Sequence, residues 1–201
     1  MSENLGFLTV IDQSPGGLTG GYLVLNGAGR PLEFHCTVPV APSKIQEILY
    51  GNTFQPFLYG ERIAQVLIQR SKLPILAVFT DHAAVLPVQP LISTPIIYAF
   101  AGLTKVGISE ELSESLKTFG IDNTRLPMGD SSLDEMPPMP HVPGFDTGNW
   151  QPVRIGNRLI AIPEAEGDSL LTEIKMRART IDLLEPFARI RLALEEAKNA
   201  A

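Results

Sequence analysis

The side chains that could do chemistry are few and scattered in this chain of 201 residues. The three histidines, His35, His82 and His141, lack the spacing of metal ligands, and the one beside a carboxylate is His82, next to Asp81. Cys36 is the single cysteine, so an intrachain disulfide is excluded. We expect its thiol to be a small buried hydrophobe on the apolar side of a strand rather than a nucleophile.

Motifs for other common chemistries are absent. The glycine-rich stretches GGLTGG and NGAG lack the strand-then-helix context of phosphate-binding loops and dinucleotide fingerprints.

Four carboxylates lie where helices or strands are expected to begin or end: Asp12, Glu47, Asp81 and Asp168. Each has an ordinary structural role, because Asp12 can begin a turn, Glu47 and Asp81 can solvate element ends, and Asp168 can cap a helix.

The elements that would position these residues begin with a three-stranded antiparallel meander. Residues 5–11 and 22–25 are apolar and β-branched, and Asn26-Gly27 is a strong two-residue turn signal between strands. Residues 32–38 then alternate in character, with Leu32, Phe34, Cys36 and Val38 predicted on the covered face.

Helices and further strands follow. Ser43 and Gln46 have the spacing of a capping box and open a helix that ends near Gly51, with Ile45, Ile48 and Leu49 turned inward. A second helix runs to about Ser71 with Ile63, Val66 and Leu67 inward. Residues 75–80 and 94–100 are predicted strands, residues 83–92 are short helix or irregular chain, and residues 109–119 are a capped helix.

The last third of the chain changes character. Six prolines between 126 and 152 predict a linker or a long surface arm. A hairpin turned at Gly156-Asn157 follows, and then a long helix that Pro186 kinks or restarts. The fold class is therefore α/β (α+β): a meander continued into a mixed sheet with flanking helices. We expect residues 1–125 to form the α/β domain, 126–152 the Pro-rich arm, and 153–201 a hairpin and helix packed on the same domain.

The order strand, strand, strand, helix, strand, helix, strand, helix is similar to that of a ribonuclease H-like (RNase H-like) domain. Over residues 7–81, DQS at 12–14 resembles the DGS of that family, GGYLVLNGAGRPLEF resembles its glycine-led second and third strands, and FTD at 79–81 ends the fourth strand. The resemblance implies that Asp12, Glu47 and Asp81, with Asp168, hold Mg²⁺ for phosphodiester cleavage.

Composition favours a different function. The formal charge of −6 makes nucleic acid an unlikely partner. No apolar run reaches ~20 residues, and the N-terminus lacks a signal-peptide pattern, so we expect a cytoplasmic protein without a membrane span. We also expect a protein partner or a homo-oligomer, because Leu183, Leu184 and Phe187 place apolar side chains on several sides of the last helix.

Two functions remain open from the sequence. The first is a non-catalytic binding or scaffold module without cofactor, which acts through protein contacts made by apolar residues of the arm. These residues are Met136, Met139, Phe145 and Trp150. The alternative is an RNase H-like nuclease that uses Mg²⁺ at Asp12, Glu47 and Asp81. For this alternative the three carboxylates must converge, and the position of Glu47 opposite Ile45 on its helix argues that they do not.

Overall fold

A seven-stranded mixed sheet forms the centre of the molecule in a computed structural model that describes residues 4–13, 16–100 and 136–199. Its strands are β1 (Asn4–Asp12), β2 (Leu18–Leu25), β3 (Pro31–Cys36), β4 (Ile75–Thr80), β5 (Ile96–Ala99), β6 (Trp150–Ile155) and β7 (Arg158–Pro163). They are arranged in the order β3-β2-β1-β4-β5-β7-β6. The pairs β1·β4 and β4·β5 are parallel, and the other neighbours are antiparallel. The predicted fold class and meander are confirmed.

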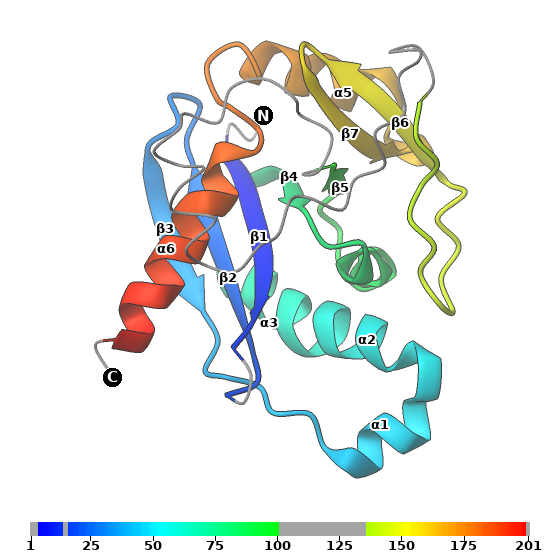
Figure 1. Cartoon of the computed structure of the whole chain (residues 1–201). Helices are drawn as coiled ribbons and strands as arrows, with labels where there is room; N and C mark the ends of the chain where they lie inside the picture. The colour runs from blue at the N-terminus through cyan, green and yellow to red at the C-terminus, as the bar shows by residue number, and fades with distance from the viewer. Residues whose placement is uncertain (1–3, 14–15, 101–135, 200–201) are drawn as a thin grey trace, which may run out of the picture.

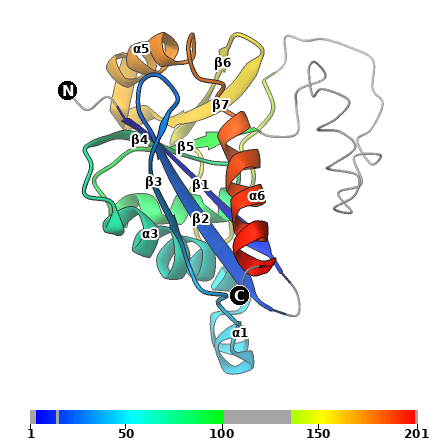
Figure 2. The same ribbon diagram turned by 90° about the vertical axis from the view of Figure 1, so that its left-hand side faces the viewer.

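Helices cover both faces of this sheet (Figures 1 and 2). One face is covered by a nearly continuous helical run and a 3-10 helix. The covering elements are α2 (Phe54–Pro56), the π-helix η2 (Phe57–Ala64), α3 (Gln65–Arg70) and η3 (Ala83–Leu91). The run begins with α1 (Lys44–Tyr50) and η1 (Gly51–Thr53), which contribute no buried residue. The other face is covered by α5 (Gly167–Arg177), which follows the short η5 (Glu164–Glu166), and by α6 (Glu185–Asn199). Two separate apolar layers result.

Two glycines in β2 let helices approach both faces of the strand. A Cβ on Gly20 would lie 2.2 Å from Ile63 Cγ2 of η2, and one on Gly21 would lie 2.3 Å from Ile190 Cγ2 of α6. Those separations are far below van der Waals contact. The tight sandwich of η2, β2 and α6 therefore depends on the Gly20-Gly21 pair.

The prediction for α1 is right about the helix and wrong about its face. Gly51 ends α1 as expected, and Ser43 precedes it as the N-cap residue but forms no side-chain cap hydrogen bond. Ile45, Ile48 and Leu49 are 69%, 70% and 77% exposed rather than buried. Figure 1 shows α1 projecting below the sheet, where no described strand lies against it. Periodicity identified an apolar face, but nothing in the described chain covers it.

The covered face of β3 is also the opposite of the predicted one. Leu32, Phe34, Cys36 and Val38 are all exposed. The side chains of Glu33 and His35, on the other face, are the more covered ones and lie 3.1 Å apart. The strand is at the edge of the sheet, beyond the reach of α6, so its apolar side has no cover. Cys36 is therefore not the buried hydrophobe we expected.

The C-terminal region forms two helices where one long helix was predicted. α5 ends at Arg177 and α6 starts again at Glu185, with Pro186 as its second residue, so the proline marks the predicted restart. Asp168 lies in the first turn of α5, and the N-cap residue is Glu166. Leu183 and Phe187 are buried in the chain's own core, which removes the reason given for an oligomer. Val66, expected inward in the second helix, is 48% exposed.

The Pro-rich region is only partly described. Residues 136–149 are irregular apart from one isolated bridge, and β6 begins at Trp150, inside the predicted arm. Pro152 is accommodated because β6 is an edge strand, where a missing amide donor costs little. The predicted helix at 109–119 lies outside the described residues. Within those residues we find no helix with the length and apolar character that crossing a bilayer requires.

Candidate functional site

The carboxyl ends of the parallel strands β1 and β4 position Asp12 and Asp81. Leu8 pairs with Thr80, so the residue level with Asp81 is Thr9. Asp12 lies three residues further along, which corresponds to about 10 Å at ~3.3 Å per residue. Alternation along the strands also separates the two side chains. Asp12 follows Leu8 and Val10 on the face covered by η2, whereas Asp81 follows the side chains that face α6.

Asp81 is held by a cation from the other end of the chain. Its side chain is 2% exposed, and its Oδ2 accepts a hydrogen bond from Nη2 of Arg191 on α6. Its Oδ1 is buried and has no hydrogen-bond partner among the described residues. Nε2 of His82 lies 3.8 Å from that oxygen, beyond hydrogen-bond distance. The carboxylate is thus neutralised by a guanidinium and has one unused oxygen.

The His82 ring lies beside Tyr59 on the η2 side of the sheet. The two ring centroids are 5.5 Å apart with the planes inclined by 54°. Burial lowers the pKa of His82 below its usual value, and Asp81 and a hydrogen bond with the Val10 backbone oppose this only in part. Burial and the nearby charge of Asp12 raise the pKa of Tyr59. Near neutral pH the site therefore presents two uncharged aromatic rings.

The remaining predicted carboxylates lie elsewhere. Glu47 is on the projecting α1, where its side chain is 55% exposed and lies 3.7 Å from Lys44. Asp168 is in α5, which covers the face of the sheet opposite to the one covered by η2. No three His, Cys, Asp or Glu side chains of the described residues gather as a metal site. The Asp81 Oδ1 atom, which has no hydrogen-bond partner, could be one ligand of a metal ion. A pair of Mg²⁺ ions needs several carboxylate ligands, and the other predicted carboxylates do not surround this atom. The carboxylates implied by the resemblance therefore do not fit the ions.

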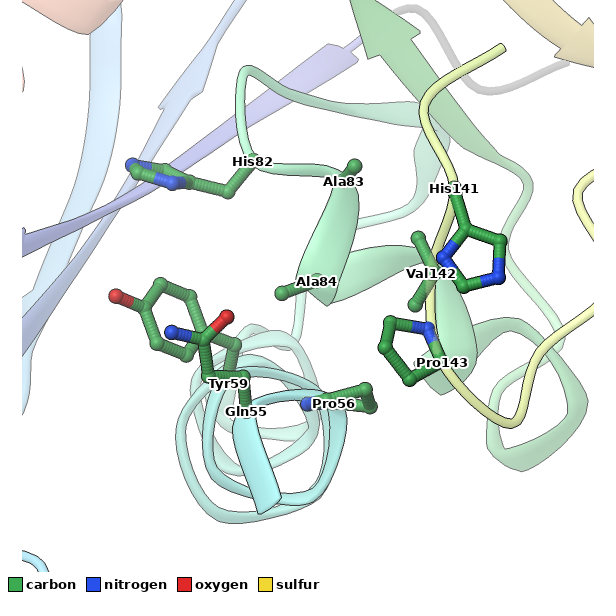
Figure 3. A pocket seen from close by; sticks show the side chains of 9 residues that line it. All are labelled: Gln55, Pro56, Tyr59, His82, Ala83, Ala84, His141, Val142 and Pro143. Atoms are coloured by element: carbon green, nitrogen blue, oxygen red, sulfur yellow. The ribbon is translucent and has the colours of Figure 1, made fainter. Parts of the chain in front are cut away.

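A pocket of about 250 Å³ opens beside His82 (Figure 3). Helical residues Gln55, Pro56 and Tyr59 form one wall, and Ala83 and Ala84 of η3 lie opposite. The segment His141 to Pro143 closes the third side, although it is distant in the sequence. Gln55 and Tyr59 are four residues apart on one helical run, so their side chains share a face. The pocket thus combines flat apolar walls with an amide and two imidazoles.

Sequence reasoning had found only part of this pocket. His82 was singled out because it follows Asp81, but Gln55, Tyr59 and His141 were not proposed as functional. The available signal was LYG at 58–60, a tyrosine with its flanking glycine in a helix. A Cβ at Gly60 would lie 3.4 Å from the Val88 backbone nitrogen, an ordinary van der Waals contact, so packing does not require a glycine there.

The apolar residues of the arm are largely used within the molecule. Trp150 is 6% exposed, and its Nε1 donates a hydrogen bond to the Ile96 carbonyl. Met139 and Phe145 pack against the same core, and the Phe145 and Trp150 rings are 5.4 Å apart. Met136 is 39% exposed. Three of the four residues proposed for partner binding therefore support the chain's own fold.

Comparison with known proteins gives structural similarity alone. No protein-family model matches the chain, and no curated protein matches it. A crystal structure of Ciona intestinalis Endonuclease V, in complex with a 24-mer DNA containing an inosine followed by a ribo-adenosine, is similar at TM-score 0.47 and 12% identity. The similarity covers 97% of this chain and 87% of that one. A point variant of the same enzyme with a 23-mer DNA gives TM-score 0.37 at 12% identity, over 80% and 70% of the chains.

At these TM-scores the similarity carries no argument about activity. The element order of β1 to β5 agrees with the RNase H-like resemblance. Both neighbours are bound to DNA, which contradicts the expectation that nucleic acid is an unlikely partner. That expectation treated the net charge as spread evenly along the chain. The charge is in fact uneven, because residues 101–135 hold seven of the 22 acidic residues and three basic ones.

Proposed function

We infer that this chain is a nucleic-acid-binding protein that takes one unstacked base into the pocket beside His82. The observation that carries the proposal is the composition of the pocket: the Tyr59 and His82 rings, the Gln55 amide and the prolines Pro56 and Pro143 in a space of about 250 Å³. Unstacked bases are recognised by stacking on such rings and by hydrogen bonds along their polar edges.

The chemistry of the lining supports a neutral, flat ligand. Gln55 offers both an acceptor oxygen and a donor NH₂, as the mixed edge of a base requires. The lowered pKa of His82 keeps its ring uncharged near pH 7, so the pocket holds no fixed charge on this side. The nuclease alternative requires a metal set that the described carboxylates do not form, so no cleavage step is assigned to them.

A bulged duplex tests the proposal. A fluorescently labelled DNA duplex with one unpaired base is compared, by fluorescence anisotropy, with the same duplex carrying an abasic residue at the bulge. We expect the base to strengthen binding about 5- to 150-fold, the range for stacking of one base. Tyr59→Ala and Gln55→Ala should remove most of this difference. Tyr50→Ala, which removes an aromatic ring of α1 outside the pocket, should keep it.

Two results would contradict the proposal. Equal affinity for the bulged and abasic duplexes would show that the pocket takes no base. Cleavage of either duplex that requires Mg²⁺ and disappears in Asp12→Asn would establish the nuclease alternative in its place. A rise in melting temperature on adding Mg²⁺ alone would favour the same alternative, because an ion that binds only the folded state stabilises it.

A further inference from the structure

A second hollow, of about 580 Å³, lies on the opposite side of the sheet from the base pocket. It is formed where the turn between β6 and β7 meets the end of α5 and the chain that follows it (Figure 1). The turn is the predicted Gly156-Asn157 pair, and Gly156 has the positive φ of 60° that such a turn needs. The volume is within the ~300–1,000 Å³ range of ligand sites.

The lining of this hollow is strongly basic. Its charged residues are Arg154, Arg158, Lys175, Arg179 and Asp182. Asp182 is the one acid among them, and its Oδ2 pairs with Nη2 of Arg158. Burial alone would raise the pKa of Asp182, but hydrogen bonds from the Leu184 amide and from Arg158 lower it, so it stays ionised. The lining therefore holds four positive charges and one negative charge.

Two of these cations have no acidic partner among the described residues. Lys175 is exposed in the last turn of α5, and Arg179 is exposed in the turn that follows the helix. The other two come from the hairpin, Arg154 from β6 and Arg158 from β7. Cations from two elements thus converge on one concave surface, in a chain whose net charge is −6. Like charges repel, so a basic concavity of this kind is favourable when an anion occupies it.

We propose that this basic hollow, lined by Arg154, Arg158, Lys175 and Arg179, binds the phosphate backbone of nucleic acid. Arginine and lysine recognise phosphate through charge-assisted hydrogen bonds, and the Asn157 side chain at the rim adds an uncharged donor. The lining contains no aromatic side chain, so it offers no platform for stacked bases. The hollow therefore holds duplex and single-stranded backbones alike and does not select sequence.

The test measures duplex binding at several salt concentrations. The variant is Lys175→Gln with Arg179→Gln, and the matched control is Lys198→Gln with Arg70→Gln, which removes the same charge from exposed positions outside the hollow. Each phosphate contact contributes about −0.9 to the slope of log K against log salt. The hollow variant should lose about two units of slope and bind a 20-base-pair duplex about 10- to 60-fold more weakly at 0.1 M salt. The control variant should lose much less of the salt slope and much less duplex affinity.

A second measurement uses the unchanged protein. Duplex should protect Lys175 from acetylation by an amine-reactive ester, while Lys198 remains reactive. Equal slopes and affinities for the variant and its control, or unprotected Lys175, would overturn the proposal. So would a nucleoside triphosphate that binds as tightly as the duplex, because the hollow would then be a site for a free nucleotide. The base pocket is tested separately, since the bulge preference reports on Tyr59 and the salt slope reports on the hollow.

Discussion

Removing the Arg191 guanidinium should destabilise the protein through a carboxylate 110 residues away. In Arg191→Met the apolar stem is kept, but the 2% exposed Asp81 loses the one hydrogen bond its carboxylate accepts. An uncompensated buried charge costs about 3–5 kcal/mol. Because the Arg191 side chain is 35% exposed and water reaches its end of the pair, we expect about 2–3 kcal/mol. For a chain of this size, that lowers the melting temperature by about 4–12 °C.

The assay is urea unfolding at pH 7, with the free energy of unfolding measured for four proteins: the wild type, Arg191→Met, Asp81→Asn and the double variant. Asp81→Asn removes the buried charge. The double variant should therefore lose about 1–2 kcal/mol less stability than the two single variants lose together. Arg189→Met is the control on the same helix. Its partner Glu185 is 48% exposed and four residues away, so the loss should stay below about 0.5 kcal/mol.

The reasoning would be refuted by a loss for Arg191→Met no larger than that for Arg189→Met. Strict additivity in the double variant would be equally damaging, since it would show that Asp81 and Arg191 do not interact.

Three further predictions concern packing, pH and access. Gly21→Ala should cost about 1–3 kcal/mol in urea unfolding, since its Cβ would meet Ile190 at 2.3 Å; a loss below 0.5 kcal/mol would show that α6 moves away freely. The pKa of His82 is lower in the folded than in the unfolded chain, so as the pH falls the unfolded chain takes up this proton at a higher pH than the folded chain does. The free energy of unfolding should therefore fall as the pH drops below about 6.5. His82→Gln should flatten this dependence. A single proton is involved, so the slope stays below ~1.4 kcal/mol per pH unit. Identical pH profiles for the wild type and His82→Gln would contradict the assignment. Cys36 should react with a thiol reagent in the folded state as fast as a free cysteine, and protection that disappears only in denaturant would show that it is buried.

Local patterns were sufficient where neighbours in the sequence decide the structure. The Gly156-Asn157 turn, the 75–80 strand and the restart at Pro186 are found as predicted. Glu173 and Glu185 each lie four residues before an arginine of the same helix, and that spacing forms the ion pairs Glu173–Arg177 at 3.6 Å and Glu185–Arg189 at 2.6 Å. Each depends on backbone preference or on a spacing of four residues, and both are properties of a short stretch of chain.

The candidate site was not accessible in this way. Asp12 and Asp81 each end a strand as predicted, but their separation depends on the register between β1 and β4, which long-range packing sets. Arg191 reaches Asp81 because α6 returns across the sheet, and His141 reaches the pocket from within the Pro-rich region. The basic hollow likewise combines a hairpin turn with the end of a helix.

The sequence by itself determined where strands, turns and helices form in most of the described chain, and that a mixed sheet with flanking helices results. Only the tertiary structure decided which apolar faces are covered, as the exposed Ile48 and Cys36 show. It also decided which charges meet, as the pairing of Asp81 with Arg191 shows. The physical reason is that the period of a pattern follows from backbone geometry, whereas burial and pairing depend on which distant surface arrives opposite.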